Sequence, residues 1–223
     1  LKEIEKYREQ SAPAAYYYPP PADFSRPGYF YVNTYKPEQR PKFIMEALAY
    51  HEAVPGHHLQ IAIMQELKDL PELRKYEGST AFIEGWALYA EKLSKEMGFY
   101  QDDHSEYGRL NFEIWRAVRL VVDTGLHYYK WGRDEAIEYC MENSGEDDHE
   151  IEVEVDRYIA MPGQALAYKI GELKILELRA KMKSALGPVF DIKLFHDRLL
   201  ENGALPLNAL DEVMEAGRHE GKK

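Results

Sequence analysis

The sequence has few of three features that would fix its class at once: cysteines, long apolar runs and clustered basic residues. Its one cysteine, Cys140, excludes a disulfide framework and a zinc site built from several cysteines. No apolar run approaches the roughly 18–20 residues that a membrane span needs. Lys and Arg number 28 against 39 Asp and Glu, and no basic run appears. This acidic balance argues against binding to nucleic acid or to anionic lipid.

The start of the chain lacks an initiator methionine and a charged-then-apolar signal region. Leu1–Gln10 has the composition of the middle of a helix, so we expect a fragment of a longer chain whose compartment is not indicated. Hydrophobic residues make up 45% of 223, which is enough to bury a core in one large domain or two small ones.

Residues 1–36 predict an extended connector followed by one short strand. Three consecutive prolines, Pro19 to Pro21, exclude a helix and favour an extended chain over 11–22. Tyr29–Thr34 is rich in aromatic and β-branched residues, which is typical of a strand. We therefore expect a short edge strand, or a small sheet, near the N-terminus.

Residues 37–223 predict a mainly α domain that carries the chemistry. Apolar residues recur every three to four positions, and glycines and prolines separate the periodic segments. Ser79 is expected to cap the third helix. No fixed repeat is present, so a solenoid is not supported. The helices are expected at about 43–51, 57–67, 79–98, 105–129, 133–143, 147–160, 163–186, 191–201 and 207–216.

The segment His51–His58, His-Glu-Ala-Val-Pro-Gly-His-His, has the clearest chemical pattern. A zinc peptidase helix carries histidines at i and i+4, with a glutamate after the first that takes a proton from water at the metal. Here i+4 is Pro55, whose ring collides with the carbonyl of His51 in a regular helix. We predict a break at Pro-Gly that returns His57 to the face of His51, with His58 as the substitute ligand.

A third ligand is expected from Glu84 and Glu91, seven residues apart on one helix. Both flank an apolar stripe, where a glutamate is costly unless it is paired or bound to metal. We predict Glu84 as the third ligand and Glu91 as the hydrogen-bond partner of a ligand histidine. The competing interpretation is an ordinary helix with structurally satisfied histidines and a surface glutamate.

These motifs resemble the bacterial domain-of-unknown-function 885 family (DUF885). Three further segments share the resemblance: Arg26–Asn33, Arg119–His127 and Arg157–Lys169. Members are usually longer, so this chain looks like a C-terminal half whose N-terminal half completes a cleft. The family is similar to gluzincin-like helical peptidases, such as thimet-type oligopeptidases and thermostable carboxypeptidases. The resemblance implies a bacterial metallopeptidase in which Tyr29–Asn33 is an edge strand that pairs with an extended peptide.

A larger set of candidates is supported more weakly. Groups that can stabilise the oxyanion of a tetrahedral intermediate are His127, Tyr158, Tyr168 and Lys169. Arginines that can clamp a substrate carboxylate are Arg116, Arg119 and Arg157. Core packing of the tyrosines and salt bridges of the arginines compete with these roles. The segments 102–104 and 147–149, both Asp-Asp-His, are expected to be helix starts, where acids favour the helix dipole, and not metal clusters.

The sequence therefore predicts a zinc metallohydrolase that acts on a peptide or a small amide. Zn²⁺ is held by His51, His57 and Glu84, and Glu52 acts as general base on the metal-activated water. Two alternatives stay open: a non-catalytic helical module that binds or supports, and a hydrolase of non-peptide amides that uses the same centre. A metal assay separates the first alternative from the enzyme.

Overall fold

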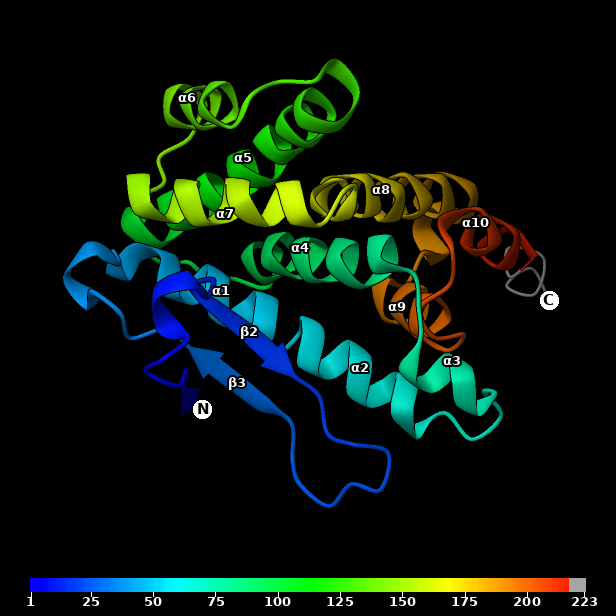
Figure 1. Cartoon of the computed structure of the whole chain (residues 1–223). Coiled ribbons are helices and arrows are strands. Elements are labelled where there is room, and N and C mark those ends of the chain that lie inside the picture. Colours follow the sequence, from blue (N-terminus) through cyan, green and yellow to red (C-terminus); the bar gives the residue numbers. More distant parts are fainter. Residues whose placement is uncertain (217–223) are drawn as a thin grey trace.

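Helices make up most of the structure, a computed structural model that describes residues 1–216 (Figure 1). The helices are α1 (Met45–Glu52), α2 (His57–Glu66), α3 (Glu72–Tyr76), α4 (Thr80–Glu96), α5 (Asp103–Thr124), α6 (Arg133–Asn143), α7 (Asp148–Ala160), α8 (Ala167–Leu186), α9 (Ile192–Leu200) and α10 (Leu207–Ala216). The strands are β1 (Lys2–Glu3), β2 (Ala15–Tyr18) and β3 (Tyr29–Val32). The predicted mainly α fold is confirmed. The end of the predicted helical domain, 217–223, lies outside the described residues.

The helix boundaries follow breaks that the sequence shows. α4 stops before Gly98, whose φ of +93° is a left-handed conformation that glycine adopts without strain. Asp102 and Asp147 precede α5 and α7, and each side chain accepts a hydrogen bond from a backbone N–H of the first turn. Both Asp-Asp-His segments are therefore helix starts, as predicted. Ser79 precedes α4, but its hydroxyl makes no capping hydrogen bond.

The strands form a sheet in the order β1-β3-β2, in which β3 is central. β3 pairs in parallel with β1, where Lys2 lies opposite Tyr31, and antiparallel with β2, where Ala15 lies opposite Val32. Figure 1 shows β2 and β3 side by side below α1. The prediction that Tyr29–Asn33 is an edge strand is wrong, because both hydrogen-bonding edges of β3 are taken. β2 lies at an edge of the sheet instead.

The expected helix over Leu1–Gln10 is also absent from the described chain. The segment forms β1 and then a 3-10 turn at Glu9–Ser11. Asn33 stabilises this turn, since its side-chain amide donates a 2.7 Å hydrogen bond to the carbonyl of Glu9. The extended connector over 11–22 likewise contains β2. Hydrogen bonding to β3 makes parts of both segments strands and outweighs the helical periodicity of the first segment.

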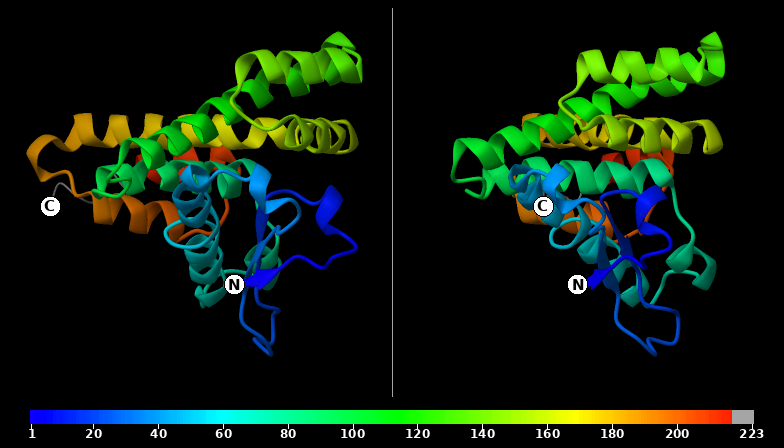
Figure 2. Two further views of the ribbon diagram at one scale, coloured as in Figure 1. Left: turned by 90° about the vertical axis from the view of Figure 1, so that its left-hand side faces the viewer. Right: turned by 60° about the vertical axis from the view of Figure 1, so that its left-hand side comes forward.

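Helix α4 lies between two helical layers (Figure 1, Figure 2). α1 and α2 contact it on one side, and α8 contacts it on the other. Gly85 of α4 faces Gly171 of α8, and a Cβ atom on either glycine would collide with the backbone of the opposite helix. This pair of glycines therefore allows the two backbones to approach closely and fixes α4 against α8.

The two faces of α4 differ in chemistry. Phe82, Trp86 and Tyr89 are buried on one face, in an apolar cluster with side chains from α8, α9 and α10. Glu84 and Glu91 lie on the opposite face, because each residue of a helix turns it by about 100°. Burial of a large apolar side chain stabilises the fold by about 1.5–3 kcal/mol. The core therefore holds α4 in place and directs the two glutamates toward α1 and α2.

A second apolar cluster joins α5, α6 and α7. α5 ends in a π-helical turn, Gly125–Tyr129, where the Trp131 ring occupies the space beside Gly125. Within residues 1–216, the helices lack the combination of length and apolar composition that a membrane crossing requires.

Candidate metal centre

The helix that begins at Met45 is interrupted where the sequence predicts. α1 ends at Glu52 and α2 begins at His57, so the predicted break at Pro55 and Gly56 is confirmed. Trp86, on α4, donates a 2.8 Å hydrogen bond from Nε1 to the carbonyl oxygen of Pro55. The loop between the two helices is therefore fixed to the core helix.

Gly56 is required at this break for a steric reason that the sequence does not show. Its φ is −75°, which does not require glycine. A Cβ atom at this position would collide with the carbonyl oxygens of Tyr50 and His51 at the end of α1. Glycine therefore allows the start of α2 to approach the end of α1 closely, and this approach brings the two histidine-bearing turns together.

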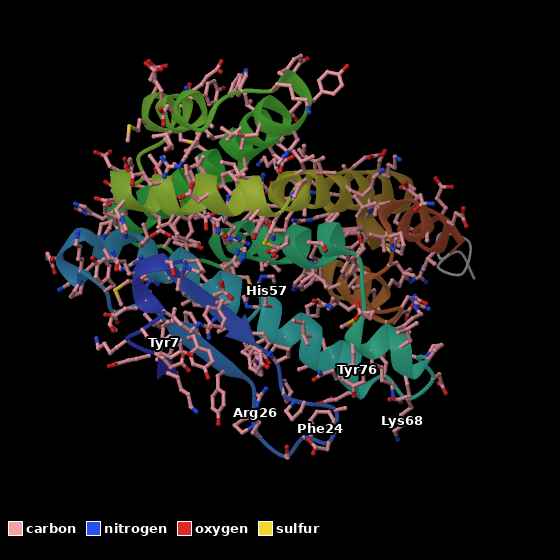
Figure 3. All side chains as sticks on the ribbon, viewed as in Figure 1. Tyr7, Phe24, Arg26, His57, Lys68 and Tyr76 are labelled. Atoms are coloured by element: carbon pink, nitrogen blue, oxygen red, sulfur yellow. The ribbon has the colours of Figure 1, made fainter. Side chains whose placement is uncertain are left out.

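His51, His57 and Glu84 converge on one point. The two imidazole centroids lie 4.7 Å apart, and Glu84 Oε2 lies 3.7 Å from His51 Nε2 and 3.3 Å from His57 Nε2. Figure 3 shows His57 at the first turn of α2, beneath α4. Two ligands of one tetrahedral zinc ion lie roughly 3.4 Å apart. The two distances from Glu84 are close to this value, and the ligand atoms of all three residues lie within 4.8 Å of one another.

A hydrogen bond between His51 and Glu91 fixes the orientation of the His51 ring. Its Nδ1 lies 2.7 Å from Glu91 Oε1, and the Glu91 side chain is 1% exposed. The predicted hydrogen bond of Glu91 is therefore present, and its partner is His51, one of the candidate ligands. Because Nδ1–H donates to this carboxylate, Nε2 is directed toward Glu84.

The structure separates the two adjacent histidines. His57 is buried and faces Glu84, whereas His58 is exposed and its Nδ1 lies 2.9 Å from the hydroxyl of Tyr17 on β2. His57 is therefore the member of the cluster, and the substitute ligand His58 is not brought to it.

Several buried polar atoms at this point have no hydrogen-bond partner among the described residues. They are Glu52 Oε2, His57 Nδ1, Glu84 Oε2 and Glu91 Oε2. Leaving such an atom unpaired in the interior costs about 1–3 kcal/mol, and native structures rarely do so without a ligand, an ion or water. The donor set, two imidazoles and one carboxylate, is one that Zn²⁺ prefers. The residues therefore fit a bound cation.

The charges of the cluster also favour a cation. Burial alone lowers the pKa of His51, but the nearby carboxylates of Glu84 and Glu91 outweigh burial and raise the pKa to about 9. Burial raises the pKa of Glu84, yet the neighbouring imidazoles of His57 and His51 hold it well below its usual range. Carboxylates thus dominate the local field, and positive charge is stabilised here.

Tyr168 is brought to the cluster, as predicted among the oxyanion candidates. Its ring stacks on His51 with centroids 6.2 Å apart. Its hydroxyl accepts hydrogen bonds from Gln164 Nε2 at 3.0 Å and Arg157 at 3.2 Å, and Gln164 also donates to Glu84 Oε1 at 3.2 Å. Gln164 was not among the predicted residues, although it lies inside a segment that carries the family resemblance.

The other oxyanion candidates have different partners. His127 Nε2 lies 2.9 Å from the carbonyl oxygen of Tyr158, whose hydroxyl accepts a hydrogen bond from Arg119 at 2.8 Å. Lys169 pairs with Glu113 at 3.0 Å and with a glutamate one turn further along α8. Over the described chain, neither His127 nor Tyr158 lines the cavity beside the cluster. The structure does not bring these three groups to the ligand atoms.

Fold and cluster together define a mainly α domain that gathers two imidazoles and one carboxylate beside a buried glutamate. The chain belongs to the family described as "Bacterial protein of unknown function (DUF885)", whose model matches residues 1–214. The resemblance predicted from the motifs is thereby confirmed. A search of curated proteins gives no match.

Two solved structures share this fold. A "putative lipoprotein" from Colwellia psychrerythraea is 43% identical with a TM-score of 0.96, over 99% of this chain and 38% of that one. A "putative lipoprotein of unknown function" from Shewanella oneidensis is 23% identical with a TM-score of 0.78, over 96% of this chain and 40% of that one. The second likeness concerns the fold alone. The chain spans about two fifths of the length of each protein.

Proposed function

We propose that this protein is a zinc-dependent hydrolase of amide bonds, with peptides as its substrates. One observation carries the proposal: His51, His57 and Glu84 offer ligand atoms that all lie within 4.8 Å of one another. Three protein ligands leave a fourth position, which is typical of catalytic zinc and not of structural zinc. A zinc ion in such a site supplies Lewis acidity, which polarises a carbonyl group and lowers the pKa of water.

Glu52 is the residue that moves the proton. It follows His51 directly, is buried, lines the cavity and has an Oε2 atom without a hydrogen-bond partner among the described residues. A carboxylate in this position accepts a proton from the attacking water and delivers it to the leaving amine. Glu52 has no ligand role in this proposal, because the three ligand atoms come from other residues.

Tyr168 is the favoured residue for stabilising the developing oxyanion. Its hydroxyl accepts hydrogen bonds from Gln164 and Arg157, so its own proton is free to be donated. Burial, and next the charge of Glu84, raise its pKa, and the hydroxyl therefore stays protonated at neutral pH. Tyr158 and His127, whose polar groups have partners elsewhere, are less suited to this role.

The edge strand β2 supports a peptide as the substrate. Ala15, the first residue of β2, and the preceding Ala14 line the cavity together with His51 and Glu52. An extended peptide that joins a free strand edge gains main-chain hydrogen bonds. β2 therefore takes the role that the sequence predicted for β3.

The neighbouring histidines provide a matched test. Zinc stoichiometry would be measured by atomic spectroscopy in the wild type, His57→Ala and His58→Ala, together with His51→Ala and Glu84→Ala. We expect one zinc per chain in the wild type and in His58→Ala, and a sharp loss in the other three. Unchanged metal content in His57→Ala would refute the site. Stoichiometric zinc without hydrolysis of any peptide library would support the non-catalytic module instead.

A further inference from the structure

A cavity of about 120 Å³ adjoins the candidate metal centre. Its wall includes His51, Glu52 and Tyr168 on the side of the cluster, and it extends between α5 and α7 to Arg116 and Glu146. Charged and polar side chains make up much of its wall, so it is suited to a polar group of the substrate.

Five of the charged side chains around this cavity, three of them arginines, are paired with one another. Arg119 lies 2.7 Å and Arg157 lies 3.1 Å from the two oxygens of Glu154. Arg40 lies 3.3 Å from Glu150. Arg119 and Arg157 therefore make structural salt bridges, which was the alternative to binding a substrate carboxylate.

Arg116 differs from these arginines. It is only 6% exposed, yet its Nε has no hydrogen-bond partner among the described residues. One terminal nitrogen donates a 3.3 Å hydrogen bond to the carbonyl of Phe112 in its own helix, and the other terminal nitrogen lies 3.6 Å from Glu91. A guanidinium has five N–H donors in a planar fork that matches a carboxylate. Arg116 is thus a buried cation that borders the cavity and whose donors are largely unused.

We propose that Arg116 binds the terminal carboxylate of the substrate, so that the enzyme acts on the last amide bond before a free C-terminus. This inference rests on the proposed hydrolase function. Glu91 links the two sites, because the same oxygen lies 2.7 Å from His51 Nδ1 and 3.6 Å from Arg116. One residue of extended chain advances by about 3.3–3.6 Å. Arg116, His51 and Glu52 line the same cavity, so a carboxylate held by Arg116 and the amide one residue before it occupy one continuous space.

Glu146 is compatible with an anion at this end of the cavity. Its Oε1 accepts a 2.9 Å hydrogen bond from Asn111. Burial raises the pKa of Glu146 to about 7, in spite of the opposing charge of Arg116. In its protonated form this carboxyl group donates a hydrogen bond to a bound carboxylate and does not repel it.

A pair of small ligands tests the carboxylate site directly. Calorimetric titration of the whole chain, metal-free and zinc-loaded, would compare N-acetyl-L-alanine with N-acetyl-L-alaninamide. In the wild type we expect the acid to bind at least about tenfold more tightly, the effect of hydrogen bonds to a charged group. Arg116→Gln should abolish this preference, and Arg116→Lys, which keeps the charge without the fork, should retain part of it. Arg133→Gln, at an exposed ion pair with Asp156, is the control that should retain all of it.

The outcomes separate this inference from the proposed function. Equal affinities in the wild type, no binding of the acid at millimolar concentration, or an unchanged preference in Arg116→Gln would each overturn the carboxylate site. The wild-type comparison decides the matter even where Arg116→Gln does not fold. Zinc content is measured in parallel: an acid preference that depends on Arg116 in a chain that binds no zinc would leave the carboxylate site standing and the hydrolase refuted.

Discussion

Two clusters of buried charge adjoin the same cavity and differ in how their hydrogen bonds are completed. In the first, Arg119 and Arg157 share the carboxylate of Glu154, and each also donates to a tyrosine hydroxyl. In the second, around His51 and Glu84, four carboxylate and imidazole atoms have no partner among the described residues. Arg119 and Glu154 are as deeply buried as His51 and His57, so burial alone does not distinguish structure from function.

The presence or absence of hydrogen-bond partners distinguishes buried charges that stabilise the fold from buried charges that are available to a ligand. A closed network satisfies its own groups and stabilises the fold, whereas buried polar atoms without a partner carry an unmet cost. The first cluster should therefore affect stability when it is changed, and the second should affect metal binding and catalysis. Each prediction below tests one side of this division.

The largest effect is expected for Glu52→Gln. Removing a general base lowers turnover by about 10²–10⁴-fold, while zinc content should stay at the wild-type value because Glu52 is not a ligand. The measurement is kcat for a peptide substrate alongside metal analysis of the same sample. Glu66→Gln, an exposed glutamate on α2, is the control. Full turnover in Glu52→Gln would show that the mechanism is wrong.

Glu154→Ala should have the next largest effect, and on stability. Removing one partner of a buried ion pair costs about 3–5 kcal/mol, here because Arg119 and Arg157 lose their shared carboxylate. Urea unfolding measures the loss, and zinc bound per folded chain should not change. A loss below 1 kcal/mol, or a parallel loss of zinc, would contradict the division between the two clusters.

Glu91→Gln tests the support of the ligand shell. Changing the hydrogen-bond partner of a ligand histidine weakens metal affinity by about 10–100-fold. Competition with a zinc chelator measures this change. Glu96 lies on α4 like Glu91 and forms an exposed ion pair with Arg179. Glu96→Gln is the control and should leave the zinc affinity unaltered. If both variants bind zinc equally well, Glu91 has no role in holding His51 for the metal.

The sequence predicted those features of the molecule that depend on neighbouring residues along the chain, such as helix breaks and the faces of helices. Pro55 and Gly56 forbid a regular helix where they stand, so the break that unites His51 with His57 follows from the sequence. The spacing of seven placed Glu84 and Glu91 on one face of α4 in the same way. Glycine and proline breaks likewise marked most helix ends.

The remainder depended on partners far away in sequence. The position of β3 in the sheet is set by β1 and β2, whose short segments carry no strong signal of their own. The three candidate arginines looked alike, and only the position of Glu154, 35 residues after Arg119, made two of them structural and left Arg116 with unused donors. Gln164 reaches Glu84 across 80 residues, which no periodicity indicates.

The smallest expected effect comes from His196, whose environment is the opposite of that of His51. Burial, and next the charge of Arg179, lower the pKa of His196 to about 4, whereas two carboxylates raise that of His51. Because the folded pKa lies below the usual 6.5, the unfolded chain binds the proton first, and stability falls as the pH drops from about 6.5 toward 4. The loss should be roughly 1–2 kcal/mol once partial exposure of the ring to solvent is allowed for. His196→Gln, which can still accept from Tyr89, should remove this part of the pH dependence in urea unfolding at pH 7 and pH 4.5. An identical pH dependence in the wild type and the variant would show that the buried ring does not titrate as its surroundings require.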